Sequence, residues 1–259
     1  MSAGLNRQSP PEIVILPDPA GLAHEGARRF AGAAASAVGE GRPFRVALSG
    51  GSTPKALFET LANEPYRSEV DWTQVEVFFS DERFVPAESP DSNYGMALTA
   101  LLNRVPIPES FVHAVPTTDI TPHEAALLYT KTIRRVFQVA ESELPCFDLI
   151  LLGLGPDGHT ASLFPDSDAL TIQDQIVAAN YVAKFDSWRI TFTYPLLNAA
   201  RCVAFLAQGL EKAEKVQQVL QGDADLPAAG VHPGAGALVW LLDRGAAGAI
   251  PPDMARDGA

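Results

Sequence analysis

Two short runs without a single polar residue limit the folds open to this chain. Residues 46–48 read VAL and residues 149–152 read LILL. A strand with one face in water alternates apolar and polar residues, whereas a central parallel strand is covered on both faces. These two runs therefore predict a parallel sheet with helices packed on both of its sides.

Strand and helix candidates alternate along the chain, which predicts a doubly wound, Rossmann-like α/β fold with a mainly parallel sheet. Strands are expected at residues 13–16, 45–48, 75–79, 147–152, 176–179, 190–194, 202–207 and 238–242. Helices are expected at residues 21–38, 54–63, 94–102, 122–140, 194–199 and 210–220. Without repeats or long linkers, the pattern indicates a single domain over 12–244, with flexible termini at 1–11 and 245–259.

The charge balance disfavours several classes of partner. The chain has 19 Lys and Arg against 31 Asp and Glu, a net charge of −12, which repels nucleic acids and anionic lipids. No run approaches the ~20 apolar residues of a membrane span, and residues 1–11 lack the apolar stretch of a signal peptide. These features fit a cytoplasmic protein and leave open whether it is a monomer or a small homo-oligomer.

Ligands of doubly wound sheets bind beyond the carboxyl ends of the strands, where residues 49–54 read SGGSTP. Gly50 and Gly51 permit close backbone approach, and Ser52 or Thr53 can cap the next helix. Free N–H groups and a helix dipole then meet at one point, which favours a small phosphate. The Gly-Lys-[Ser/Thr] ending of a nucleotide loop is absent. A plain strand-to-helix turn is the alternative interpretation.

The second loop follows the strand expected at 75–79 and places three charged residues together. Asp81, Glu82 and Arg83 come almost directly after that strand. The planar guanidinium of Arg83 suits a phosphate, although a local ion pair on a solvated turn is the alternative. Residues 89–95 then indicate a loop that leads into a helix.

The third loop, residues 153–165, reads GLGPDGHTASLFP and follows another buried strand. Its glycines and prolines predict a tight, specific turn that can bring Asp157 and His159 together. A neutral imidazole is the usual general base near pH 7. A capping histidine on a polar turn is the alternative. The convergence of three such loops in one crevice favours a catalytic role.

These three loops resemble the glucosamine-6-phosphate isomerase/6-phosphogluconolactonase family. The match is carried by residues 48–54, by residues 80–83 with Asn93 and Tyr94, and by residues 153–165. It runs from about residue 16 to residue 242, nearly the whole chain. The resemblance implies the isomerase/lactonase family fold.

Two residue differences indicate to which branch of that family the chain is more similar. The isomerase/deaminase branch usually has a glutamate five residues after the histidine, where this chain has Phe164. It also typically reads Asp-Glu-Tyr where residues 81–83 read DER. Both departures favour the lactonase branch. The rivals are the sibling isomerase/deaminase, a non-catalytic sugar-phosphate-binding regulator, and a lactonase with another sugar preference.

The resemblance implies hydrolysis of 6-phospho-D-glucono-1,5-lactone to 6-phospho-D-gluconate in the oxidative pentose phosphate pathway. It implies a cytosolic enzyme that needs no cofactor and no metal. We expect His159 to take a proton from the attacking water and Asp157 to orient its imidazole. Stabilisation of the oxyanion is left open between the side chain of Asn93 and loop N–H groups near Gly155 and Gly158.

The remaining site residues are expected to hold the substrate. Arg189 and Lys212 enter only through the resemblance, and a solvated lysine and an edge-strand arginine are the alternatives. The expected phosphate-binding residues are Gly50, Gly51, Ser52, Arg83, Arg189 and Lys212. Possible further substrate contacts are Ser49, Asp81, Asn93, Gly155 and Gly158. Such a local positive pocket can capture a dianion on an acidic surface, because screening limits the global field to ~8 Å.

Overall fold

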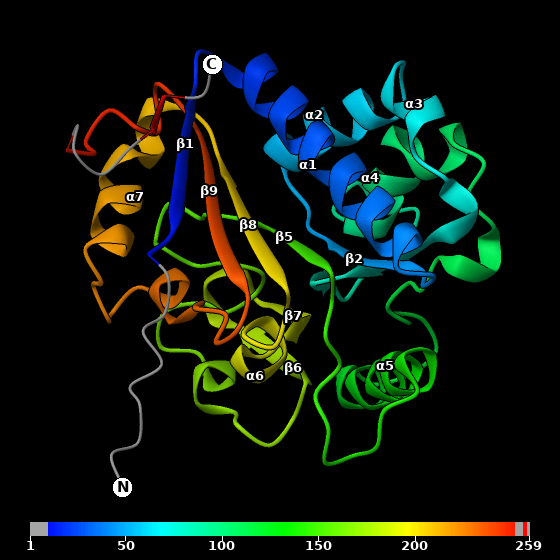
Figure 1. Ribbon diagram of the computed structural model, residues 1–259. Coiled ribbons are helices and arrows are strands. Elements are labelled where there is room, and N and C mark those ends of the chain that lie inside the picture. The colour runs from blue at the N-terminus through cyan, green and yellow to red at the C-terminus, as the bar shows by residue number, and fades with distance from the viewer. Residues whose placement is uncertain (1–9, 252–255, 258–259) are drawn as a thin grey trace, which may run out of the picture.

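The computed structural model describes residues 10–251 and 256–257 and contains two sheets (Figure 1). The larger sheet has seven strands, all paired in parallel, in the order β10-β1-β9-β8-β5-β2-β3. Its strands are β1 (Glu12–Leu16), β2 (Phe44–Leu48), β3 (Val75–Phe79), β5 (Leu149–Gly153), β8 (Cys202–Ala207), β9 (Ala237–Asp243) and β10 (Arg256–Asp257). The predicted mainly parallel α/β fold is confirmed.

The smaller sheet is antiparallel, in the order β4-β7-β6, and was not predicted as a separate sheet. Its strands are β4 (Asp81–Arg83), β6 (Val177–Val182) and β7 (Ser187–Phe192). The strand segments expected at 176–179 and 190–194 belong to this sheet. Residues 81–83 were expected to lie in a loop, because three charged residues carry no strand signal.

Seven α-helices within the described residues connect the strands. They are α1 (Pro19–Gly39), α2 (Ser52–Leu61), α3 (Tyr66–Glu69), α4 (Asn93–Ala100), α5 (Pro122–Phe137), α6 (Tyr194–Leu197) and α7 (Ala213–Leu220). Six of them were expected, with ends that differ from the expected spans by up to three residues, and α3 was not expected. The helix α5 stops three residues before the expected end because Gln138 is left-handed, with φ 55°. The expected helix at 210–220 begins with a 3-10 turn, Leu210–Lys212.

Aromatic side chains join the two sheets in one core. The ring of Phe147, which precedes β5, lies 5.3 Å from that of Phe192 in β7 and 5.2 Å from that of Phe78 in β3. All three side chains are fully buried. Edge and tilted ring contacts of this kind add to the stabilisation from buried area, so the small sheet is held firmly against the edge of the large one.

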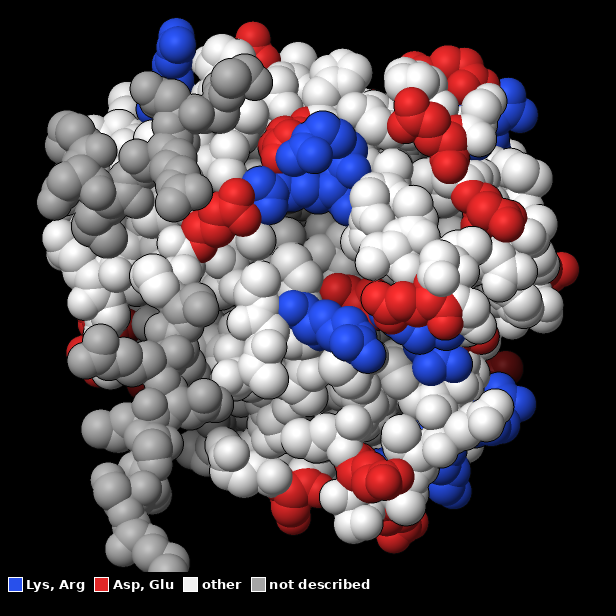
Figure 2. Space-filling model, in the orientation of Figure 1, with Lys and Arg blue, Asp and Glu red and all other residues white. Residues whose placement is uncertain are grey.

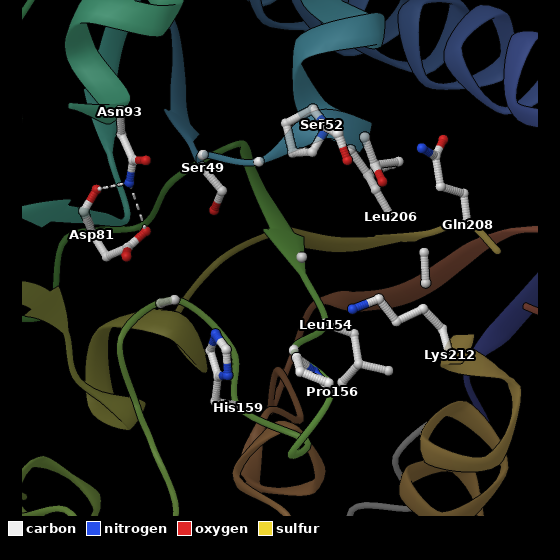
Figure 3. A pocket seen from close by; sticks show the side chains of 18 of the residues that line it. Ser49, Ser52, Asp81, Asn93, Leu154, Pro156, His159, Leu206, Gln208 and Lys212 are labelled. Carbon is white, nitrogen blue, oxygen red and sulfur yellow. Dashed lines mark hydrogen bonds between the residues drawn. The ribbon is translucent and has the colours of Figure 1, made fainter. Parts of the chain in front are cut away.

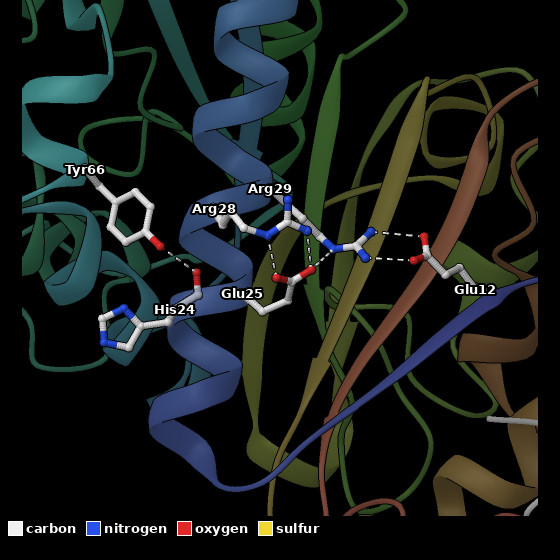
Figure 4. Close-up of polar contacts among 6 residues, drawn as sticks. All are labelled: Glu12, His24, Glu25, Arg28, Arg29 and Tyr66. Atoms are coloured by element: carbon white, nitrogen blue, oxygen red, sulfur yellow. Dashed lines mark hydrogen bonds and ion pairs between the residues drawn. The ribbon is translucent and has the colours of Figure 1, made fainter. Parts of the chain in front are cut away.

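The helix α1 is tied to the first strand by a chain of ion pairs (Figure 4). Arg29 donates to Glu12 of β1 at 2.8 and 3.0 Å and to Glu25 at 2.6 Å, and Arg28 also donates to Glu25. Burial raises the pKa of Glu25, but the hydrogen bonds and charges of the two arginines outweigh it and lower that pKa. Glu25 therefore stays ionised between its partners.

The flexibility predicted for residues 1–11 and 245–259 stays a prediction, because residues 1–9, 252–255 and 258–259 lie outside the described part of the chain. Within the second segment, Ala246 and Ala247 are buried and β10 pairs with β1. Among the described residues, no helix has the length and apolar character that crossing a membrane requires.

The hydroxyl of Tyr129 connects α5 to the end of β3 and gives a first prediction. It accepts a hydrogen bond from the Phe79 N–H at 2.7 Å and is buried. We expect Tyr129→Phe to lower the free energy of unfolding by ~1–3 kcal/mol, because a buried N–H loses its acceptor. Urea unfolding measures the change, with Tyr66→Phe, whose hydroxyl bond is exposed, as the control. Equal losses in the two variants would contradict the assignment.

Candidate active site

Three strands of the large sheet end side by side and are joined there by two serines. The Ser49 hydroxyl, just after β2, donates to the Leu151 carbonyl of β5 at 2.7 Å. It also lies 2.6 Å from the hydroxyl of Ser80, just after β3. Because the Ser49 proton is already used, Ser80 is the donor in that second bond. The three loops that follow are thereby held at one edge of the sheet.

The glycine-rich loop starts α2 differently from the expectation. Gly51 is the N-cap residue, with φ 105° and ψ 169°, a conformation open essentially only to glycine. No side chain caps this helix, so the prediction that Ser52 or Thr53 does so is wrong: Ser52 is already its first helical residue. The first N–H groups of α2 therefore have no intrahelical acceptor and can meet an anion.

Gly50 makes room for a buried amide. A β-carbon on Gly50 would lie 1.8 Å from Asn93 Oδ1, so only glycine lets this side chain pack here. Asn93 Nδ2 donates to the Asp81 carbonyl at 3.0 Å and to Asp81 Oδ1 at 3.3 Å. The other carboxylate oxygen, Oδ2, accepts the Ser162 hydroxyl at 2.6 Å. Asp81 and Asn93 thus form a fixed polar wall.

Glu82 organises the second loop, a role that nothing in the sequence indicated. It is only 2% exposed and accepts the backbone N–H groups of Arg83, Asn93 and Tyr94 at 2.7–2.8 Å. Burial raises the pKa of Glu82, and these bonds oppose the shift. The suggested ion pair with Arg83 is absent from the described residues, and Arg83 Nη1 donates to the Asp91 carbonyl at 2.7 Å.

The imidazole of His159 is held on three sides. Its Nδ1 lies 2.5 Å from Asp157 Oδ1, as the third loop predicted, so the Nδ1–H tautomer leaves Nε2 as a proton acceptor. A β-carbon on Gly155 would lie 2.0 Å from Nδ1, so the ring packs directly on that glycine. The Phe164 ring stacks on the imidazole, with centroids 4.0 Å apart.

Asp157 remains ionised under ordinary conditions. Burial alone would raise its pKa, but hydrogen bonds from His159 and Lys184, together with the charge on His159, hold that pKa at about 2. The Lys184 ammonium lies 3.2 Å from Asp157 Oδ2. Lys184 comes from a hairpin 27 residues further along the chain, which is why no local pattern pointed to it.

A cavity of about 260 Å³ lies where the three loops converge. Figure 3 shows Ser49 and Ser52 on one side and His159 and Pro156 on the other, with Lys212 entering from one end. Of the predicted site residues, those lining it are Ser49, Gly50, Gly51, Ser52, Asp81, Arg83, Asn93, Gly155, His159 and Lys212. Asp157, Gly158 and Arg189 do not line this cavity.

Gly158 and Arg189 lie outside this cavity and have other contacts. Gly158 has φ 78°, and a β-carbon there would lie 2.8 Å from Leu226, so it shapes the loop. Arg189 stands opposite Arg83 in the β4–β7 pairing and lines an adjoining cavity of about 430 Å³. Burial lowers the pKa of Arg189, and the Arg83 charge adds to this. Arg83 and His159 line both cavities.

Lys212 differs from most cations of this acidic chain. Several Lys and Arg side chains on the face in Figure 2 lie beside Asp or Glu. Most Lys and Arg side chains of the described residues bond to a carboxylate or to another oxygen, as Arg42 does to Asp148. Within the described part of the chain, the Lys212 ammonium has no ion pair and no hydrogen bond, and Figure 3 shows it pointing into the cavity. No group of three or more metal-ligating side chains occurs in the described ranges.

One family model and several named relatives match this chain over most of its length. A family model described as glucosamine-6-phosphate isomerases/6-phosphogluconolactonase matches residues 17–240. The 6-phosphogluconolactonase of Synechocystis sp. is 43% identical over 219 residues, which cover 83% of this chain and 88% of that protein. That of Homo sapiens is 42% identical over 222 residues, which cover 83% and 84%.

Solved structures of members of this family have the same fold as this chain. The 6-phosphogluconolactonase from Trypanosoma cruzi has a TM-score of 0.82 at 30% identity and covers 94% of this chain and 99% of its own. A monomeric glucosamine-6-phosphate deaminase shares the fold, with a TM-score of 0.77 at 17% identity over 92% and 99% of the two chains. The chain belongs to the glucosamine-6-phosphate isomerase/6-phosphogluconolactonase family, which confirms the predicted resemblance.

The contact between Gly50 and Asn93 gives a prediction about stability. We expect Gly50→Ala to lower the free energy of unfolding by ~1–3 kcal/mol, because the new methyl group must displace a buried, hydrogen-bonded amide. Gly153→Ala is the matched control, since a β-carbon there meets nothing within 4 Å. Denaturant unfolding of both variants tests this. A Gly50→Ala protein as stable as the control would contradict the packing described.

Proposed function

We infer that this chain hydrolyses 6-phospho-D-glucono-1,5-lactone to 6-phospho-D-gluconate, a step of the oxidative pentose phosphate pathway. The observation that carries the inference is one cavity that combines an acceptor imidazole with an unpaired lysine and a free helix N-terminus. The names of the relatives, 42–43% identical over 83% of this chain, support the same activity. A cytoplasmic location remains part of the proposal.

The hydrolysis proceeds without a covalent intermediate. His159 Nε2 accepts a proton from water while the water oxygen attacks the lactone carbonyl carbon. The ionised Asp157 stabilises the imidazolium that forms. The tetrahedral intermediate collapses, the bond from that carbon to the ring oxygen breaks, and the imidazolium returns its proton to this oxygen. The new carboxylic acid then loses its proton to solvent, and His159 is neutral again.

The two ends of the cavity present different groups to the substrate. In Figure 3, Ser52 and Lys212 lie at one end and Asp81 and Asn93 at the other, with His159 between them. The phosphate would bind the N–H groups that start α2 and the ammonium of Lys212. The sugar hydroxyls would then meet Asp81 and Asn93. Arg83, at the junction of the two cavities, would reach the substrate from the side.

The sibling isomerase/deaminase activity is not favoured at this site. The family resemblance places a glutamate of that branch at position 164, and here Phe164 stacks on the imidazole. A ring in that place supports the histidine without offering a carboxylate for proton transfer.

The proposed general base gives a direct prediction. We expect His159→Ala to reduce kcat for the phosphorylated lactone by ~10²-fold or more, because water loses its proton acceptor. The assay uses freshly generated lactone, with the spontaneous rate subtracted. His24→Ala, which changes an exposed histidine on α1, is the control. Full activity in His159→Ala would exclude the general-base role, and an inactive wild type would exclude the lactonase itself.

The phosphate site gives a second prediction. We expect Lys212→Met to raise KM for the phosphorylated lactone by about tenfold or more, because a charged hydrogen bond is lost. KM for unphosphorylated gluconolactone should change little. Lys215→Met, which changes a lysine within α7 that does not line the cavity, is the matched control. Equal effects of Lys212→Met on both substrates would show that Lys212 does not bind the phosphate.

A further inference from the structure

The Asp157 carboxylate has two partners, one on each oxygen. Oδ1 lies 2.5 Å from His159 Nδ1, and Oδ2 lies 3.2 Å from the ammonium of Lys184. Lys184 is therefore the third member of a line of groups that runs Lys–Asp–His. The mechanism above uses only the last two, and Lys184 lines neither of the two cavities that contain His159.

The hairpin that carries Lys184 is fixed against the same histidine by a second contact. Lys184 lies in the 3-10 turn Ala183–Phe185 between β6 and β7. The next residue, Phe185, packs its ring edge-on to Phe164 at 5.7 Å, and Phe164 stacks on His159. Asp186 closes the turn with a left-handed conformation, φ 46°, and accepts the Tyr181 hydroxyl. The ammonium thus has a defined place beside Asp157.

We propose that Lys184 is a positioning residue for the hydrolysis. Its ammonium binds the Asp157 carboxylate oxygen that does not contact His159, and its positive charge weakens the attraction between that carboxylate and the imidazole proton. This proposal rests on the function proposed above. A carboxylate with no other partner stabilises imidazolium and so makes the histidine slower to release a proton and less available as a neutral base. A cation on the opposite oxygen offsets part of that effect.

The size of the effect follows from the exposure of the pair and from the other charges around the imidazole. The Lys184 side chain is 59% exposed, so solvent and salt screen its charge. The remaining charged side chains in the cavities that His159 lines are Asp81, Arg83, Asp91, Arg189 and Lys212. None of them contacts Asp157, so removing Lys184 changes only one partner of the pair.

The test is the pH dependence of kcat/KM in variants of graded charge. We expect Lys184→Met to move the acidic limb upward by roughly half a pH unit, and Lys184→Glu by up to about twice as much. Lys184→Arg should restore the wild-type limb. Lys131→Met, at an exposed site on α5, is the control. The substrate phosphate titrates in this range too, but it does so equally in every variant.

Salt separates an electrostatic role from a packing role. Because the Debye length falls to ~3 Å at 1 M salt, the difference between Lys184→Met and wild type should shrink there. An acidic limb at the same pH in all variants would overturn the proposal, even if kcat fell. A limb that moves equally in Lys184→Arg and Lys184→Met would do so as well.

A measurement without substrate keeps this inference separate from the lactonase assignment. The pH at which the ring resonances of His159 titrate, assigned by comparison with His159→Gln, should rise in Lys184→Met and not in Lys131→Met. An unchanged titration would overturn the role of Lys184 whatever the enzyme's activity. A shifted titration in a protein with no lactonase activity would support the charge coupling and refute only the reaction.

Discussion

The structure depends on the parallel pairing of three neighbouring strands, because that pairing brings their carboxyl ends to one edge of the sheet. The strands β2, β3 and β5 lie next to one another, and the Ser49 and Ser80 hydroxyls join their ends. Each strand then leads into a different loop. One loop supplies helix N–H groups, one a buried polar wall, and one a histidine. Distant parts of the sequence form a single cavity only because parallel strands align their ends.

Glycines allow the loops to approach each other more closely than other residues would. Gly50 accommodates the Asn93 amide, and Gly155 accommodates the imidazole of His159, at distances that a β-carbon would not permit. Gly51 adopts a backbone conformation that starts α2 without a side-chain cap. The absence of a β-carbon at Gly50 and Gly155 therefore shapes the site as much as the polar groups that line it.

The small antiparallel sheet contributes to the site from outside the doubly wound core. Its strand β4 places Arg83 at the junction of the two cavities, and the hairpin between β6 and β7 delivers Lys184 to Asp157. The aromatic contacts of Phe192 hold this sheet against the core. The fold thus combines a parallel sheet, which brings the loops together, with a small antiparallel sheet whose hairpin contacts Asp157 and Phe164, the two side chains that hold His159.

The sequence by itself determined the parallel sheet, the glycine-rich loop, and the pair of Asp157 and His159, because each depends on residues close together in the chain. Apolar runs report burial on two faces, and a short loop limits how far its two polar residues can separate. Tertiary structure alone decided that Glu82 accepts the first two N–H groups of α4, that Arg189 stands outside the main cavity, and that Lys184 reaches Asp157. The placements of Arg189 and Lys184 depend on the pairing of β4 with the hairpin of β6 and β7, which lies far from β4 in the chain, and no local pattern encodes such a contact.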